Sequence, residues 1–96
     1  MSTRVTDKNL EAIAARINHM TNSPIEAYTR TLGKLRANIG NYHISHQYGG
    51  VCLHRMVNEA GGVSDVLMSG HVPKRELQTA MLAFIRGLEI REEVAA

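Results

Sequence analysis

The sequence is poor in aromatic residues, cysteine and proline, and it has no long apolar run. Tryptophan is absent and Phe84 is the only phenylalanine, so the core must be built from aliphatic side chains and methionine. Cys52 is the only cysteine, which excludes an intramolecular disulfide and offers no argument for an oxidising compartment. No segment approaches the roughly 20 apolar residues of a membrane-spanning helix, and the N-terminus lacks the apolar stretch of a signal peptide. We therefore expect a cytoplasmic protein with no membrane partner.

A strong excess of charge is also lacking. Eleven Lys and Arg residues against nine Asp and Glu residues give a net charge of +2. This balance is not typical of nucleic-acid-binding proteins, so direct binding to nucleic acid is not our leading expectation. With 96 residues, of which 44% are hydrophobic and 21% charged, the chain has the composition of one small globular domain. We expect that domain to span residues 1–96, with frayed ends at 1–5 and 91–96.

Two segments have the apolar periodicity of amphipathic helices. The first is predicted over residues 7–20, with Thr6 as its N-cap, and the second over residues 73–89, with a proline in its first turn. Between Ile25 and Gly40 no period is sustained, and we expect a loop with a short extended piece around residues 35–39. The apolar positions of the two helices are Leu10, Ile13, Ala14, Ile17 and Met20, and Leu77, Met81, Phe84, Ile85 and Leu88.

Two Gly-Gly pairs, at residues 49–50 and 61–62, lie in a segment of alternating polarity. Each pair is followed directly by valine. Glycines free to take positive φ, flanked by alternating residues, are typical of antiparallel hairpins. We therefore predict a three-stranded meander with strands at residues 41–48, 51–57 and 63–69. The predicted fold class is α+β, in the order α-β-β-β-α.

The predicted turns fix a strand register. A two-residue turn at Gly49-Gly50 would place Ile44 opposite Arg55, and a five-residue loop at 58–62 would place Arg55 opposite Asp65 and Val57 opposite Val63. A slip of one residue would exchange the two faces. The first face would carry Tyr42, Ile44, Val51, Leu53, Val57, Val63 and Leu67. The second would carry His43, Ser45, Gln47, Cys52, His54, Met56, Ser64, Val66 and Met68.

The polar side chains of the first hairpin do not predict catalysis or metal binding. His43 and His46 point to opposite faces because strand side chains alternate, which prevents the convergence that zinc requires. Cys52 and His54, at i and i+2 on a strand, lie about 7 Å apart at Cα, and no third group is placed to orient the histidine. The Gly-Gly pairs lead into strands, whereas phosphate-binding loops lead into helices. We predict no metal, no cofactor and no enzymatic activity.

Two sets of residues are candidate binding sites. If both helices cover the first face of the sheet, the second face is an exposed patch suited to a protein partner or to a homodimer that Val66→Glu would disrupt. If the helices lie on opposite faces, that patch is core, and the sequence leaves this alternative open. The protein-binding set is His43, His54, Met56, Val66 and Met68. An alternative anion-binding set, for a nucleotide or nucleic acid, is Lys34, Arg36, Arg55, Lys74 and Arg75, the last two being cations at a helix N-terminus, where the dipole disfavours them.

Four patterns resemble small bacteriophage and prophage accessory proteins over about residues 17–88. They are I-N-x-x-T-x-S-P at 17–24, Y-G-G at 48–50, R-M-V-N-x-x-G-G-V-S-D-V at 55–66 and G-x-V-P-K-R-E-L at 70–77. The resemblance implies a viral or mobile-element product in the bacterial cytoplasm. By analogy with proteins of that kind, we expect a non-enzymatic protein that binds a host protein or ribonucleoprotein complex and inhibits or redirects it, with anti-CRISPR or other anti-defence activity as specific forms. The alternatives are a nucleotide- or nucleic-acid-binding protein and a virion or assembly component.

Overall fold

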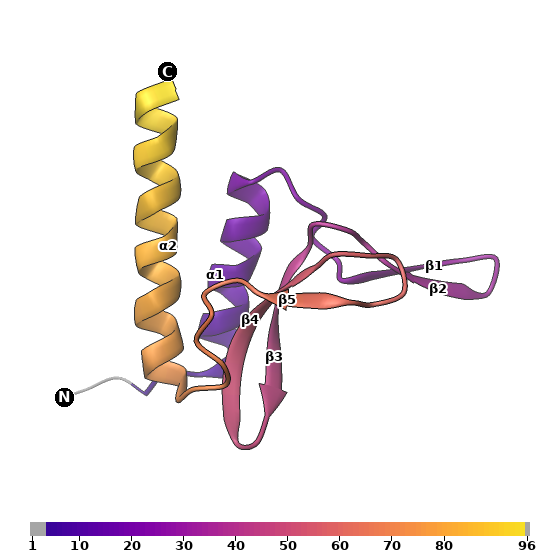
Figure 1. Ribbon diagram of the computed structural model, residues 1–96, viewed down its shortest axis with the longest axis horizontal. Coiled ribbons are helices and arrows are strands. Elements are labelled where there is room, and N and C mark those ends of the chain that lie inside the picture. Colours follow the sequence, from indigo (N-terminus) through magenta and orange to yellow (C-terminus); the bar gives the residue numbers. More distant parts are fainter. Residues whose placement is uncertain (1–3, 96) are drawn as a thin grey trace.

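The computed structural model describes residues 4–95 and has five strands in two sheets, flanked by two helices (Figure 1). The predicted α+β class is confirmed, but the predicted three-stranded meander accounts for only part of the strands. The second sheet is a two-stranded hairpin, formed where a loop was expected. The elements are α1 (Asp7–Met20), β1 (Tyr28–Thr31), β2 (Lys34–Ala37), β3 (Tyr42–Gln47), β4 (Gly50–Met56), β5 (Val63–Asp65) and α2 (Lys74–Ala95).

Helix α1 has the predicted bounds and the predicted cap. The Thr6 hydroxyl accepts a hydrogen bond from the Asn9 N–H at 3.2 Å, and the Asn9 side-chain oxygen accepts one from the Thr6 N–H at 2.9 Å. This reciprocal arrangement satisfies N–H groups that have no partner inside the helix. Val5, just before the cap, is only 8% exposed and belongs to the core, so the chain is ordered earlier than expected.

Helix α2 is longer than predicted. It continues to Ala95, beyond the predicted end at residue 89, and its last turns extend past the end of α1 (Figure 1). Residues 91–95, expected to fray, are therefore helical. Residues 1–3 and 96, also expected to fray, lie outside the described residues.

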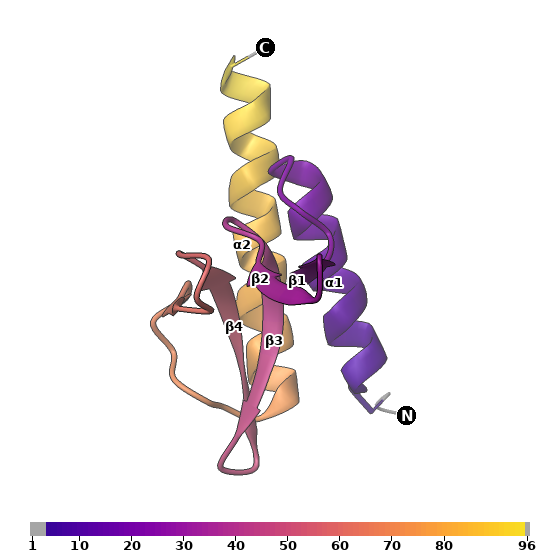
Figure 2. The ribbon, with the colours of Figure 1, turned by 90° about the vertical axis from the view of Figure 1, so that its right-hand side faces the viewer.

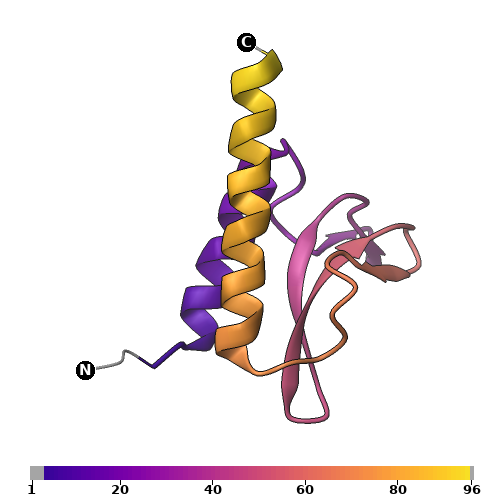
Figure 3. The same cartoon turned by 60° about the vertical axis from the view of Figure 1, so that its left-hand side comes forward.

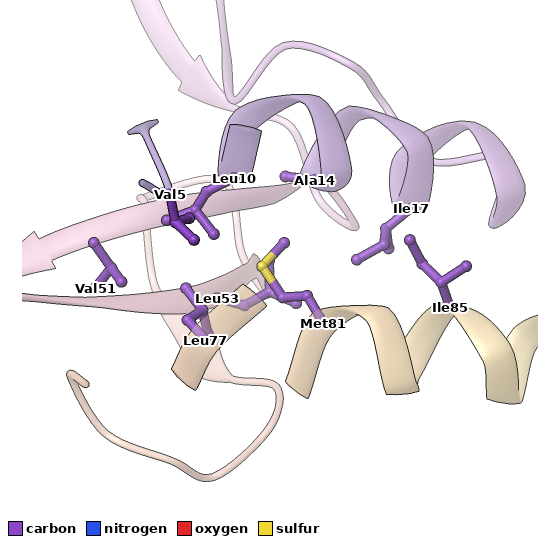
Figure 4. Packing of buried hydrophobic residues seen from close by; sticks show 9 residues of the cluster. All are labelled: Val5, Leu10, Ala14, Ile17, Val51, Leu53, Leu77, Met81 and Ile85. Atoms are coloured by element: carbon purple, nitrogen blue, oxygen red, sulfur yellow. The ribbon is translucent and has the colours of Figure 1, made fainter. Parts of the chain in front are cut away.

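Both helices pack on the same face of the β3-β4-β5 sheet (Figures 2 and 3). The core lies between the helices and this face, and it is aliphatic and methionine-containing, as the composition predicts (Figure 4). Leu53, Leu77 and Met81 are completely buried in it. The residues drawn are Val5, Leu10, Ala14, Ile17, Val51, Leu53, Leu77, Met81 and Ile85.

The β3–β4 register differs from the prediction by two residues. Ile44 lies opposite Leu53, not Arg55, because the turn is made by Tyr48 and Gly49 at φ of +54° and +74°. A shift of two residues preserves side-chain direction, so the predicted faces of these two strands hold. Gly50 is needed for a different reason: a Cβ there would lie 3.0 Å from the backbone of residues 71–72, which pairs with β4 through the Val51–Val72 bridge.

The β4–β5 register differs by one residue, and this exchanges the faces of β5. Met56 lies opposite Val63 and His54 opposite Asp65, so the predicted Val57–Val63 and Arg55–Asp65 pairs are wrong. The cause is that Val57 belongs to the loop, where its N–H donates to the Gly62 carbonyl at 2.9 Å.

Residues 25–40, expected to be a loop, contain the β1–β2 hairpin. Its turn is made by Leu32 and Gly33 at φ of +53° and +78°. A Cβ at Gly33 would meet no atom within 4 Å, so this glycine serves the backbone conformation rather than packing. The hairpin projects from the side of the molecule (Figure 1). We call residues 28–37 the arm.

Candidate functional site

The predicted protein-binding set does not form an exposed patch. Met56 is 1% exposed, and Val66 packs against the core because of the one-residue shift in β5. Met68 is 90% exposed but lies in the connection after β5, and only His43 and His54 are cross-strand neighbours. The homodimer built on this face therefore loses its structural basis, and Val66→Glu would place a charge against the core rather than in an interface.

Three histidines form a row on the face of the meander opposite the helices. The rings of His43 and His54 lie 5.9 Å apart, and those of His54 and His71 lie 5.7 Å apart, each pair edge to face. Burial lowers the pKa of His43 and of His54, and the neighbouring imidazoles lower both further. His43 and His54 therefore favour the neutral form. Within residues 4–95, no group of three or more His, Cys, Asp or Glu side chains is arranged to hold a metal ion.

Cys52 is a buried structural thiol. Burial, followed by a hydrogen bond with Asp65, raises its pKa to about 11, so the reactive thiolate is scarce at neutral pH. Burial acts to raise the pKa of Asp65, but the Gly70 N–H, which donates at 2.8 Å, and the Cys52 thiol outweigh it and lower the pKa overall. The hydrogen bond from the Gly70 N–H ties the connection after β5 to Asp65, the last residue of that strand.

The predicted anion-binding set is divided among three places: β2, the start of α2, and β4. Lys74 lies 3.2 Å from the carboxylate of Asp7, where the two helices begin, and this ion pair offsets the unfavourable placement of a cation at a helix N-terminus. His46 also contacts Asp7, at 3.1 Å. The hydrogen bonds from His46 and Lys74 lower the pKa of Asp7. Arg75 opens the same helix, which lies apart from the arm in Figure 1.

The structure brings Lys34 and Arg36 together on the arm. The cross-strand pairs Thr29–Arg36 and Thr31–Lys34 place two hydroxyls and two cations on one side of the ribbon. We call Thr29, Thr31, Lys34 and Arg36 the basic face. The other face carries Tyr28, Arg30, Leu35 and Ala37.

The arm also exposes apolar side chains. Leu32 at its tip is 98% exposed, and Leu35 and Tyr28 are 56% and 45% exposed. Near the base of the arm, Ile25 and Ile39 are 57% and 55% exposed. An exposed cluster of this kind is typical of a binding surface rather than of core packing.

Two asparagines, the buried Asn41 and the half-buried Asn38, fasten the base of the arm. The Asn41 amide donates to the carbonyls of Pro24 and Ile25 at 2.9 and 3.0 Å, and Asn41 is 1% exposed. Asn38 donates through its backbone N–H to Ala27, and through its side chain to Glu26, both at 2.9 Å. These bonds define where the arm leaves the body, while its outer part faces solvent.

Arg55, the remaining member of the anion-binding set, stacks over the ring of Tyr42 at 5.8 Å from its centroid. Sequence reasoning missed the arm as a unit and so missed Thr29, Thr31 and Leu32. The signal that could have found it is Leu-Gly between two short segments rich in threonine, lysine and arginine, which reads as an exposed hairpin once a leucine is allowed in the turn.

Comparisons with protein-family models, with curated proteins and with solved structures give no match. Neither helix, over the part of the chain that the structure describes, is long and apolar enough to cross a membrane. The functional argument therefore depends on the geometry of the arm.

Proposed function

We propose that this protein is a non-enzymatic binding protein of the phage accessory type, which docks onto a host macromolecule through the arm and inhibits or redirects it. The observation that carries the proposal is Leu32. It is 98% exposed and adopts a positive φ, which costs a leucine roughly 1–2 kcal/mol relative to an ordinary conformation. The positive φ serves the two-residue turn between β1 and β2, but glycine or asparagine would meet that need at lower cost, and folding does not explain an exposed leucine there. Tyr48 and Met68 share the positive φ, and Leu32 differs from them in lying on the arm with the exposed Leu35 and Tyr28.

The surroundings of Leu32 support a role in binding. Leu35 and Tyr28 extend the apolar surface along the arm, and a two-stranded ribbon of this size is marginally stable on its own in water. A partner that covered the arm would remove this surface from water, at about 25 cal/mol for each Å² buried.

The proposed setting comes from the resemblance to phage accessory proteins. It supports a partner in the cytoplasm of a bacterial host, either a host protein or a ribonucleoprotein complex such as a CRISPR–Cas effector. The raised pKa of the Cys52 thiol supports a non-enzymatic role, because the one cysteine of the chain is poorly suited to act as a nucleophile.

The test is affinity purification from the host cell with Leu32→Asn/Leu35→Thr as the arm variant. Asparagine tolerates positive φ and threonine suits a strand, so the fold should be retained. Tyr48→Asn/Met68→Asn is the matched control, since Tyr48 and Met68 are 97% and 90% exposed at φ of +54° and +55° on other turns.

We expect a macromolecule that the wild type and the control retain in equal yield, and that the arm variant loses at least tenfold. Equal retention by all three proteins would contradict docking through the arm. Capture of phage capsid or tail proteins would instead favour the virion or assembly role.

A further inference from the structure

We propose that the arm binds the phosphate backbone of double-stranded DNA through its basic face, with the ribbon lying in the major groove. This inference rests on the proposed function, because it names the chemistry of the partner that docks on the arm. The proposed partner is duplex DNA, either free or presented by a larger complex.

Positive charge is concentrated on the arm. Three of the eleven basic residues of the chain, Arg30, Lys34 and Arg36, lie in residues 28–37, and none of the nine acidic residues does. The arm thus has a net charge of +3, and the remaining residues, with eight basic and nine acidic groups, have −1. The nearly balanced charge of the whole chain conceals a cationic projection on a slightly anionic body. Such a charge distribution steers a polyanion to the arm.

The basic face carries side chains of the kinds that bind phosphate. Lysine, arginine and threonine side chains are among the usual donors to phosphate oxygens. The Thr29 hydroxyl already donates to the Asn38 side chain at 3.2 Å, so the proposed phosphate donors are Lys34, Arg36 and Thr31. Lys34 and Arg36 lie two residues apart on one strand, which separates their Cα atoms by about 7 Å. Phosphates follow one another at roughly 3.4 Å of axial rise along each DNA strand, so the two cations can reach different phosphates.

The shape of the arm suits the major groove of DNA. Its two strands run about 4.8 Å apart, and the major groove of B-form DNA, roughly 12 Å wide, admits a two-stranded ribbon. Leu32 would then lead into the groove, where an apolar side chain can contact thymine methyl groups. The major groove of A-form RNA is too deep and narrow for such entry, so duplex DNA fits the arm better than duplex RNA.

Glu59 limits this binding. Its carboxylate lies 3.9 Å from the Arg36 guanidinium, and both side chains are 63% exposed. A surface ion pair of this kind is weak, and it competes with phosphate for the same arginine. Removing the carboxylate should therefore strengthen DNA binding, whereas a purely structural role of Arg36 would make the same change neutral or harmful.

The test is fluorescence anisotropy with a labelled DNA duplex of about 20 base pairs, at several salt concentrations from 50 to 200 mM, the range in which phosphate contacts weaken markedly. Lys34→Gln/Arg36→Gln is compared with Lys8→Gln/Arg86→Gln, which removes the same charge from the helices. Each phosphate contact adds about 0.9 to the slope of log K against log salt, so the arm variant should lose about 1.8 from that slope. We expect it to bind at least tenfold more weakly at 50 mM salt, the control to change less than threefold, and Glu59→Gln to bind more tightly than wild type.

Three results would overturn the inference: no binding to the duplex at 50 mM salt, equal loss in the control variant, or tighter binding to single-stranded DNA or to duplex RNA. The proposed function is judged separately. If the duplex is not bound, but a host protein is still captured from a nuclease-treated lysate in a Leu32-dependent manner, the inference fails and docking through the arm stands. If DNA binding depends on the basic face, but no host macromolecule is captured in a Leu32-dependent manner, the proposal that a host target docks on the apolar tip is rejected.

Discussion

Asn18 offers the sharpest test of how α1 is joined to the sheet. Its side chain is 1% exposed, and it both accepts from the Tyr42 N–H at 2.7 Å and donates to the Tyr42 carbonyl at 2.9 Å. Because β3 is an edge strand of its sheet, Asn18 takes the place of a neighbouring strand for this residue. We predict that Asn18→Ala is among the most destabilising single changes on the surface of α1 that faces β3.

The magnitude follows from the groups left unpaired. Asn18→Ala removes two hydrogen bonds and leaves the N–H and the carbonyl of the half-buried Tyr42 without these partners, at up to about 1–3 kcal/mol each. Partial access of water to the new space reduces the sum, and we expect a loss of about 2–4 kcal/mol in the free energy of unfolding. For a domain of this size, 1 kcal/mol lowers Tm by roughly 4–8 °C, so the loss should exceed about 8 °C.

Urea and thermal unfolding followed by circular dichroism measure this effect. Gln47→Ala is the control, since Gln47 is exposed on the same strand and its loss should cost less than about 0.5 kcal/mol. If Asn18→Ala cost no more than the control, the amide would not be joining helix to strand, and the reasoning would be refuted.

Three further predictions concern the histidine row, the buried cysteine and two glycines. Because the pKa values of His43 and His54 are lowered in the folded protein, the unfolded chain binds protons more readily. The free energy of unfolding should therefore be at its full value above about pH 6.5, and should fall as the pH drops through the pKa values of these histidines in the folded protein. His43→Gln/His54→Gln should flatten this pH dependence in urea titrations between pH 8 and 5. The Cys52 thiol, with a pKa of about 11, should resist a thiol reagent at pH 8 in the folded protein and react at once in denaturant, and rapid reaction of the folded protein would count against its burial. Gly50→Ala should lower the free energy of unfolding by about 1–3 kcal/mol, because its Cβ would lie 3.0 Å from the backbone. Gly33→Asn, at a positive φ with open space around it, should lower that free energy less. A larger loss for Gly33→Asn than for Gly50→Ala would contradict the roles given to both glycines.

The sequence predicted what depends on apolar periodicity. The stripe from Leu10 to Met20 gave α1 its correct bounds, and the stripe from Leu77 to Leu88 placed α2 correctly except for its end. That end was missed because the apolar residues beyond the predicted end, Ile90 and Val94, are 46% and 81% exposed and do not continue the buried stripe. The i,i+3 ion pair between Arg86 and Glu89, at 3.6 Å, supports the helix there.

The sequence predicted less well what depends on turn chemistry. Gly49-Gly50 suggested the turn, but Tyr48 occupies its first position, and the strand register moved by two residues. Valine is a residue type that favours strands, yet Val57 belongs to a loop. This shifted the β4–β5 register by one residue, exchanged the faces of β5, and turned Val66 toward the core. Intrinsic preference could not have given these results, because a tyrosine at positive φ and a valine in a loop are both exceptions to it.

The arm was missed for a related reason, and the charge of the chain was misread in consequence. A leucine at positive φ gives no turn signal, so residues 25–40 were assigned to a loop, and Lys34 and Arg36 were grouped with Lys74 and Arg75 by residue type alone. The folded structure separates Lys34 and Arg36 from Lys74 and Arg75. It shows an arm with three cationic side chains and no acidic residue. A net charge of +2 describes neither the arm at +3 nor the body at −1. Since electrostatic attraction at physiological salt falls off over about 8 Å, a polyanion that touches the arm responds mainly to the local charge. The composition of the whole chain therefore cannot exclude nucleic acid as the partner of a protein whose charge is divided in this way.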